Sequence, residues 1–234
     1  MNSPNTTETE LRELMCEIGR RVWLRQYVAA NDGNFSLRLG DNHLLCTPTC
    51  VSKGFMRPEQ LAVIDFEMNQ ISGPIRVTSE IRMHLAIYAQ RTDVQAIVHT
   101  HSPAATGFAV AHRELPTGIL PEIEINLGVI PTVAYETPGT DAFADSVGQV
   151  AREHDAMLLE NHGLVTVGDT LEQAYFRMES VEHYCNILLA ASKVGGWQTI
   201  PGDKRKPLAS RRELAEWNST SSGLKSVQSG VLKA

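Results

Sequence analysis

Two histidines at the end of an apolar run constrain the fold of this chain more than any other feature. His99 and His101 follow the apolar residues 96–98 and are separated by one threonine. In an extended strand, residues two apart point to the same face, so both imidazoles would project side by side at the strand end. Pro103 then ends the strand pairing, and the small residues after it suit a helix start. The stretch predicts a buried strand that brings two possible metal ligands to one edge of a sheet.

A third histidine follows a second apolar run. His162 comes shortly after residues 156–159 and directly before a glycine, a pattern typical of a tight turn. Three neutral imidazoles on a tetrahedral zinc leave one position open, which is the pattern of a catalytic site. The four cysteines share no spacing with the histidines, so thiolate ligands are not expected. We therefore predict a metal site of His99, His101 and His162; alternatively, the first two only bond to carbonyl groups at a strand end.

Composition excludes several classes of protein. A chain of 234 residues can bury one core, so we expect a single domain over residues 8–217 between disordered tails at 1–7 and 218–234. The net charge of −6 gives no electrostatic footprint for nucleic acid. No apolar run approaches the roughly 18 residues of a membrane span, and the N-terminus lacks the order of a signal peptide. The cysteines form no paired framework, so reduced thiols and a cytoplasmic location are predicted.

Hydrophobic periodicity predicts an α/β domain in which helices cover a sheet. Apolar positions three and four apart indicate helices, and alternation or short apolar runs bounded by turn residues indicate strands. The expected helices cover 8–23, 80–90, 104–112, 141–154 and 171–194, and the expected strands cover 35–39, 43–47, 61–66, 94–99, 130–133, 157–159 and 164–167. Ser79, Thr140 and Thr170 are the expected N-caps of three of the helices.

Glu80 stands at the start of a predicted helix, directly after Thr78 and Ser79. A carboxylate there is favoured by the helix dipole, so the residue could be an ordinary helix-start glutamate. The alternative is a catalytic base beside the metal. His84 lies one turn further along the same helix, and we expect it to pack in the core rather than to bind the metal.

Three polar segments together suit a phosphate group. Residues 33–36 and 47–54 are polar turns, and Thr78 and Ser79 precede a helix. They supply hydroxyl groups, backbone N–H groups and a helix N-terminus, which are the groups that bind phosphate in proteins. Each segment alone is an ordinary turn, and no Walker or dinucleotide fingerprint is present.

The order and spacing of these motifs resemble the class II aldolase/adducin family. The segments that carry the resemblance are Gly33-Asn34-Phe35-Ser36, Thr47-Pro48-Thr49, Ser79-Glu80 with His84, His99-Thr100-His101, residues 135–140 and Asn161-His162-Gly163-Leu164. They lie between about residue 8 and about residue 193, and the histidines are the most specific of them. The resemblance implies a three-layer α/β/α fold around a mixed, mostly antiparallel sheet, and a cyclic homotetramer with active sites between subunits.

The resemblance also implies an activity and roles for the site residues. It implies a metal-dependent aldolase that cleaves a phosphorylated ketose, similar to fuculose 1-phosphate, into dihydroxyacetone phosphate and an aldehyde. The enediolate formed would be stabilised by zinc, or another divalent ion, on the three histidines, with Glu80 as the acid/base residue. The positions that match the family's phosphate site are Gly33, Asn34, Thr49, Thr78 and Ser79.

Two departures from the family pattern leave alternatives open. Leu120 stands where such aldolases have a tyrosine that serves the aldehyde side, and Cys50 stands in place of a glycine beside the phosphate. The alternative reactions are decarboxylation or dehydration of a phosphorylated keto sugar or sugar acid. The candidates for binding a substrate carboxylate are Arg82 and Lys53, and the candidates for lining the altered side are Glu122, Glu124 and Tyr135. A non-catalytic, adducin-like interaction domain is disfavoured because all three histidines and the glutamate are present.

Overall fold

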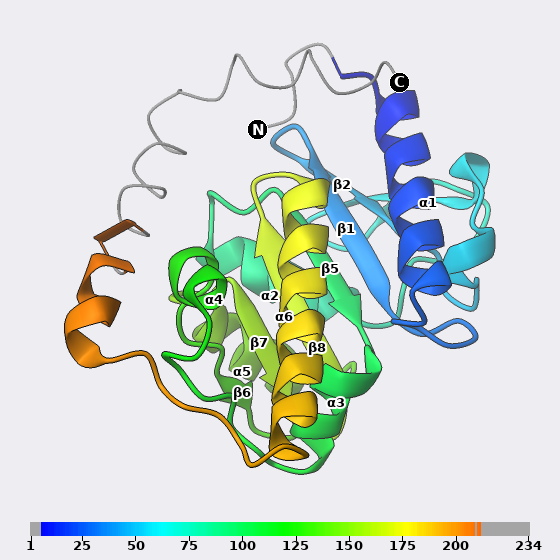
Figure 1. The fold of residues 1–234 in the computed structure, drawn as a ribbon. Helices are drawn as coiled ribbons and strands as arrows, with labels where there is room; N and C mark the ends of the chain where they lie inside the picture. The colour runs from blue at the N-terminus through cyan, green and yellow to red at the C-terminus, as the bar shows by residue number, and fades with distance from the viewer. Residues whose placement is uncertain (1–5, 209, 212–234) are drawn as a thin grey trace, which may run out of the picture.

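A single mixed sheet forms the middle layer of the molecule (Figure 1). The computed structural model describes residues 6–208 and 210–211, and in that part of the chain the strand order is β4-β3-β2-β1-β5-β8-β7-β6. The strands are β1 (Asn34–Leu39), β2 (His43–Cys46), β3 (Ala62–Asp65), β4 (Gln70–Ser72), β5 (Ala96–Thr100), β6 (Thr132–Val133), β7 (Ala156–Leu159) and β8 (Gly163–Gly168). Strands β6 and β7 run parallel, and the other neighbours run antiparallel. The predicted sheet is therefore confirmed.

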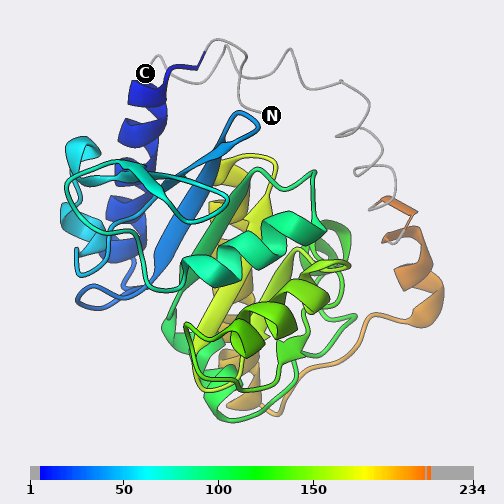
Figure 2. The same ribbon diagram turned by 180° about the vertical axis from the view of Figure 1, so that it is seen from behind.

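Helices cover both faces of this sheet, as the two opposite views show (Figures 1 and 2). One core cluster receives side chains from α1 (Glu8–Leu24), α3 (Pro103–Val110), α4 (Pro121–Asn126) and α6 (Leu171–Ser192). The opposite cluster receives side chains from α2 (Ile81–Gln90) and α5 (Asp141–Ala151). Successive residues of the central strand β5 alternate between the clusters, with Val98 in the first and Ile97 in the second. The predicted α/β/α layering is therefore confirmed.

The helix starts follow the capping residues in most cases. Thr140 and Thr170 cap α5 and α6 as predicted, and Thr7 forms a capping box with Glu10 at the start of α1. The predicted cap at Ser79 is wrong, because α2 begins at Ile81 and its N-cap residue is Glu80. Residues 1–5 and 218–234 of the predicted tails lie outside the described residues.

Three short elements were not predicted. Strand β4 is exposed at the sheet edge, α4 has six residues, and η1 (Lys53–Phe55) is a single 3₁₀ turn. Elements of this length contain too few residues to display a hydrophobic period.

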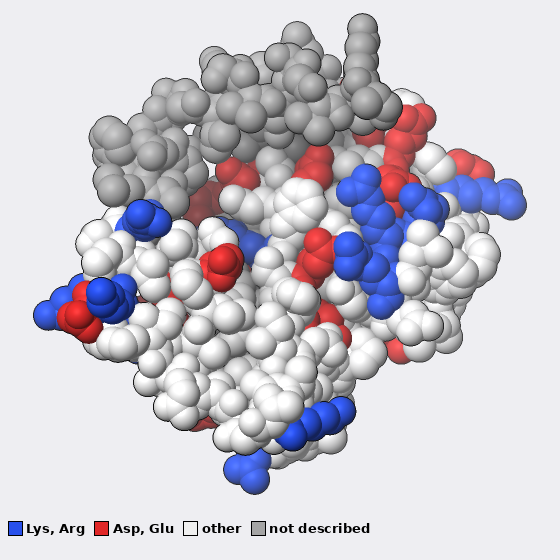
Figure 3. All heavy atoms as spheres, viewed as in Figure 1, with Lys and Arg blue, Asp and Glu red and all other residues white. Residues whose placement is uncertain are grey.

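On the face shown in Figure 3, basic side chains gather over α1, where Arg20 and Arg21 both pair with Glu17. Among the described residues, no helix is both long and apolar enough to cross a membrane.

Candidate metal centre

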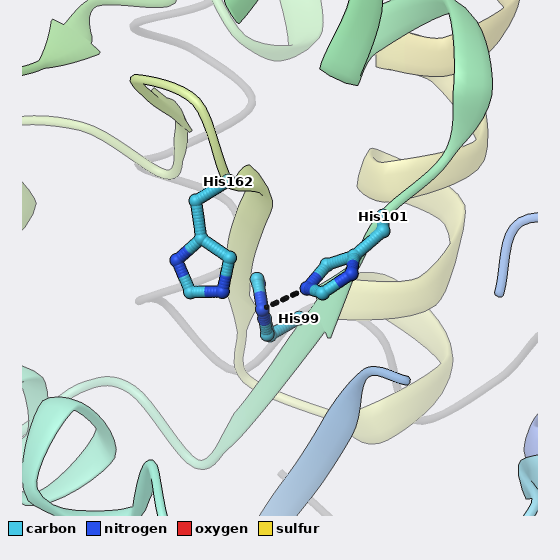
Figure 4. A group of neighbouring side chains, drawn as sticks. All are labelled: His99, His101 and His162. Atoms are coloured by element: carbon cyan, nitrogen blue, oxygen red, sulfur yellow. Dashed lines mark hydrogen bonds between the residues drawn. The ribbon is translucent and has the colours of Figure 1, made fainter. Parts of the chain in front are cut away.

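Three histidines from two separate parts of the chain converge at the end of β5 (Figure 4). His99 is the fourth residue of β5, His101 follows the strand, and His162 lies in the turn between β7 and β8. The ring centroids are 5.0, 4.8 and 5.0 Å apart, and the three rings are inclined to one another by 66–68°. One potential ligand atom from each residue lies within 4.8 Å of the other two. This nearly equilateral arrangement can surround one cation.

The nitrogen atoms of His99 and His101 fit a shared metal ion. Burial lowers the pKa of His99 well below its ordinary value, so its ring is neutral. Its Nδ1 donates to the Leu164 carbonyl oxygen at 3.0 Å, which leaves Nε2 without a proton. That Nε2 lies 3.1 Å from Nε2 of His101. Two nitrogens on one tetrahedral zinc would lie about 3.3 Å apart, given zinc–nitrogen bonds of about 2.0–2.1 Å.

The third ring reaches this point because the turn that carries it is tightly packed. Asn161 adopts a φ of +52°, and the next residue but one, Gly163, opens β8. A Cβ on Gly163 would lie 2.5 Å from the Thr100 carbonyl oxygen and 2.9 Å from the His101 ring. The glycine therefore permits the strand to approach the ligands. Nδ1 of His162 is buried and has no hydrogen-bond partner among the described residues.

Glu80 adds a carboxylate to the same cluster. Its Oε1 lies 3.0 Å from Nε2 of His162, and its Oε2 lies 3.4 Å from Nε2 of His99. Asn34 donates to Oε2 at 2.6 Å from Nδ2. Burial raises the pKa of the Glu80 carboxyl group, and its hydrogen bonds with His162 and Asn34 oppose that rise. The side chain is thus directed to the histidines and does not cap α2, which explains the shifted helix start.

Asp32 belongs to this cluster and was missed from the sequence. Its Oδ2 lies 3.6 Å from Nδ1 of His101, on the side of the ring away from His99. A carboxylate beside the outer nitrogen of a ligand histidine favours the proton there and leaves the inner nitrogen free for a metal. The antiparallel pairing of Asn34 with His99 brings Asp32 to this place. The sequence feature that could have identified Asp32 is its place two residues before β1, the strand that pairs with β5.

The polar segments predicted to hold phosphate lie side by side. Thr49 N donates to the Arg76 carbonyl oxygen at 2.8 Å, and Thr78 N donates to the Thr47 carbonyl oxygen at 3.2 Å. The Thr78 hydroxyl accepts from Glu80 N at 3.3 Å, so this segment leads directly to the metal centre. Ser79, which lies between Thr78 and Glu80 in the sequence, is exposed. Their phosphate-binding role remains a prediction.

Gly33 and Cys50 show what the backbone of these segments requires. Gly33 has a φ of +73°, and a Cβ there would lie 2.8 Å from the His99 carbonyl oxygen, so its space is needed by β5. Cys50 has a φ of +57°, in the left-handed region that favours glycine. The departure from glycine at this position therefore places a thiol on a backbone conformation that a side chain rarely adopts.

Several other candidates are engaged elsewhere. Lys53 is 1% exposed and donates to two backbone carbonyl oxygens, of Asn31 and Val51, while Arg82 pairs with Asp141 at 2.7 Å. Neither is directed to the metal centre by these contacts. Glu124 pairs with Arg205 at 2.7 Å, Glu122 and Tyr135 are exposed, and Leu120 is the N-cap residue of α4. His84 is fully buried and hydrogen-bonded, as predicted for a residue that packs in the core.

Comparison with known proteins gives consistent matches. A family model described as the class II aldolase and adducin N-terminal domain matches residues 13–189. L-fuculose phosphate aldolase from Methanococcus maripaludis is 38% identical over 163 residues, which cover 70% of this chain and 87% of that protein. The 3-oxo-tetronate 4-phosphate decarboxylase of Escherichia coli is 30% identical over 216 residues, covering 91% and 97%. The crystal structure of YgbL from Escherichia coli has a TM-score of 0.82 at 27% identity and covers 87% of this chain and 100% of that chain.

Proposed function

Because this chain belongs to the class II aldolase and adducin family, we propose that it is a zinc-dependent lyase acting on a phosphorylated ketose. The observation that carries the proposal is the convergence of three imidazoles and one carboxylate at the end of β5. The proposed reaction is aldol cleavage of a substrate similar to fuculose 1-phosphate, which releases dihydroxyacetone phosphate and an aldehyde. A cytoplasmic homotetramer with active sites between subunits is proposed from family membership alone.

Glu80 is the proposed acid/base residue. A divalent ion on the three histidines would polarise the carbonyl and hydroxyl oxygens of the substrate and stabilise the negative charge of an enediolate. In cleavage, the bond between the third and fourth carbons breaks, the proton of the hydroxyl group on the fourth carbon passes to water, and the electron pair stays on the three-carbon fragment. Glu80 returns a proton to that carbon. The reverse step requires the ionised carboxylate, which removes the same proton.

The phosphate of the three-carbon fragment is assigned to the polar segments beside Glu80. The proposed binding residues are Gly33, Asn34, Thr49, Thr78 and Ser79. The hydroxyl groups of Thr49, Thr78 and Ser79 can each donate a hydrogen bond to phosphate. The Thr78 hydroxyl group only accepts, from Glu80 N, and among the described residues neither the Thr49 nor the Ser79 hydroxyl group donates to a backbone carbonyl oxygen. Binding the phosphate there would use binding energy to position the reacting carbon beside Glu80.

Decarboxylation is the second candidate reaction, and the residue at position 120 favours it. Loss of carbon dioxide from a 3-oxo-4-phospho sugar acid leaves the same three-carbon enediolate, and Glu80 would protonate it in the same way. Carbon dioxide departs without the transfer of a hydroxyl proton, whereas a departing aldehyde must first give its hydroxyl proton to an acceptor. Leu120 can neither accept nor donate a proton. The similarity to a 3-oxo-tetronate 4-phosphate decarboxylase over 91% of this chain supports the same candidate.

One experiment separates the two reactions. Purified protein reconstituted with zinc is incubated with a panel of ketose 1-phosphates and 3-oxo-4-phospho sugar acids, and dihydroxyacetone phosphate, aldehyde and carbon dioxide are measured in each reaction. Aldol cleavage predicts dihydroxyacetone phosphate and aldehyde in equal amounts. Carbon dioxide in place of aldehyde would replace the aldolase proposal with the decarboxylase. Turnover that persists after complete metal removal would overturn the metal centre itself.

A further inference from the structure

A buried chain of hydrogen bonds leads away from Glu80 into the core between β1 and α2. Asn34 contacts His84, with 2.6 Å between Oδ1 and Nε2. Nδ1 of His84 lies 2.7 Å from the Ser36 hydroxyl oxygen, which lies 2.9 Å from the Tyr88 hydroxyl oxygen. The four side chains are at most 4% exposed. The periods of the two elements create this chain, because Asn34 and Ser36 are two apart on a strand and the other two are four apart on a helix.

The donors and acceptors of this chain can be assigned by exclusion. An ionised carboxylate only accepts, so Asn34 donates to Glu80 from Nδ2 and presents Oδ1 to His84. His84 must then donate from Nε2. Burial lowers the pKa of His84 to about 4, so the ring is neutral and its Nδ1 accepts from the Ser36 hydroxyl group. The Ser36 oxygen accepts in turn from Tyr88, whose hydroxyl group also lies 3.5 Å from the Gln95 carbonyl oxygen. Every bond of the chain therefore points toward Glu80.

The orientation of the Asn34 amide is the property that this chain determines. The two ends of a carboxamide have nearly the same size, so packing alone does not distinguish the two orientations. The flipped orientation would place the amide oxygen against the Glu80 carboxylate and the amide nitrogen against Nε2–H of His84. The buried imidazole of His84 has a hydrogen bond at each ring nitrogen. It therefore supplies a fixed N–H donor to the Asn34 amide oxygen, which an apolar side chain could not do.

We propose that His84 is a positioning residue that holds the Asn34 amide in the orientation that donates to Glu80, and so fixes the Glu80 carboxylate toward the three histidines. The inference rests on the proposed function, because the effect is measured on turnover. Both ring nitrogens of His84 are hydrogen-bonded within the buried chain, so His84 acts on Glu80 through Asn34 and not by a direct hydrogen bond.

The test compares two substitutions of His84. Glutamine can place an N–H donor near the position of Nε2, whereas leucine fills similar space without a donor. We expect His84→Leu to lower kcat roughly 10- to 100-fold, the usual range for a lost hydrogen bond that acts on a charged group, with KM and zinc content little changed. His84→Gln should retain most of the activity. Met83→Leu, a change of another buried residue of α2, is the matched packing control.

A double-mutant cycle with Asn34→Ala distinguishes positioning from simple structural damage. If His84 acts through Asn34, His84→Leu should cause no further loss of kcat once the amide is absent. An equal loss in both backgrounds would overturn the inference, as would unchanged kcat in His84→Leu. Tyr88→Phe, at the far end of the chain, should change kcat less than His84→Leu, and a larger effect would contradict the proposed direction.

Nitrogen NMR of the zinc-loaded protein keeps this test separate from the proposed function. The His84 ring should carry its proton on Nε2, and this proton should exchange faster in Asn34→Ala. A proton on Nδ1 would overturn the inference whatever the substrate. If the wild-type protein turns over none of the phosphorylated substrates while His84 shows the Nε2–H form, the proposed function fails and the orientation of Asn34 stands.

Discussion

The metal centre and the neighbouring substrate segments are built in different ways. The metal centre, formed by Glu80 and the three histidines, lies at the end of buried strands, and each of its groups contacts another group of the cluster. The substrate segments, which contain Thr49, Cys50 and Ser79, are turns with side chains that are half-buried or exposed. The two regions meet at Thr78 and Glu80.

This difference separates the reaction from the choice of substrate. Groups at the ends of paired strands are fixed by register and packing, so the metal centre cannot shift without disturbing both cores. Side chains on turns can change without such a cost. A relative named as an aldolase and another named as a decarboxylase match this chain at similar identity. Under the proposed function, the same carbanion chemistry on different substrates would account for both matches.

The largest expected effect comes from the carboxylate of the metal centre. Glu80→Gln removes the acid/base group but keeps the shape of the side chain, so turnover should fall about 10²- to 10⁴-fold. Zinc content per chain should remain unchanged, because the three histidines are intact. Steady-state kinetics and metal analysis measure the two properties. Glu59→Gln, an exposed change in η2 (Pro58–Gln60), is the control, and undiminished turnover in Glu80→Gln would remove it from the mechanism.

A buried charge beneath the substrate segments gives a prediction that depends on pH. Burial lowers the pKa of Lys53 to about 8, although the charges of Asp32 and Cys50 oppose this shift. Above pH 8 the folded state loses this proton while the unfolded state keeps it to about pH 10.4, so stability rises with pH. The stability of wild type relative to Lys53→Met should increase by about 2 kcal/mol from pH 8 to pH 10.

Urea unfolding of both proteins at the two pH values measures this change, because all other titrating groups are common to both and cancel. A difference that stays constant with pH would show that Lys53 keeps an ordinary pKa. Such a result would also show that burial does not make the Lys53 ammonium group easier to deprotonate than that of an exposed lysine.

The tight packing of the metal centre predicts a loss of stability on adding one methyl group. Gly163→Ala would place its Cβ 2.5 Å from the Thr100 carbonyl oxygen, and should lower the free energy of unfolding by about 1–3 kcal/mol. Gly107→Ala is the matched control, because it lies in α3 with nothing within 4 Å of the added Cβ. The control should gain about 0.5–1 kcal/mol from helix propensity. Equal effects of the two changes in urea unfolding would refute the tight approach of β8.

Asp32 should tune metal affinity rather than bind the metal. Asp32→Ala removes the carboxylate beside Nδ1 of His101, and zinc affinity should fall by about tenfold, the lower end of the range for such partners. Competition with a chelator of known affinity measures the change. Asp32→Asn keeps an acceptor and should lose less. An unchanged affinity in Asp32→Ala would limit the metal centre to the histidines and Glu80.

The smallest effect is expected in the substrate segments. Thr49→Val removes one hydroxyl donor from the proposed phosphate site, and should raise KM about fivefold, equivalent to about 1 kcal/mol. Zinc affinity and stability should stay as in wild type, since among the described residues the Thr49 hydroxyl group is hydrogen-bonded to the neighbouring Cys50 and not to the metal centre. Thr92→Val, at an exposed site before β5, is the control. A change in zinc affinity with Thr49→Val would contradict the separation of the two regions.

The convergence of the three histidines could be predicted because strand spacing expresses geometry directly. His99 and His101 obey the period of a strand, and His162 precedes a glycine that the tight turn requires. The sheet and its helices were predicted for the same reason, since their hydrophobic periods are long enough to recognise. The missed cap of α2 has a specific cause, because the Glu80 side chain is drawn to the histidines.

Residues that act through long-range pairing could not be predicted. Asp32 reaches His101 only because β1 lies beside β5, and His84 meets Asn34 only because α2 packs on that strand. No local pattern in the sequence records either contact. Short elements such as β4 and α4 were missed because they carry no period.

The register of β5 has a consequence for folding quality. Val98 and Ile97 face opposite cores, and His99 shares its face with Ile97. A slip of one residue against β1 or β8 would exchange the two faces and direct the imidazole of His99 into the wrong layer. A mispaired molecule would therefore lose its ion-binding capacity together with its packing. Stoichiometric uptake of zinc would serve as a direct indicator of correctly folded protein in any preparation.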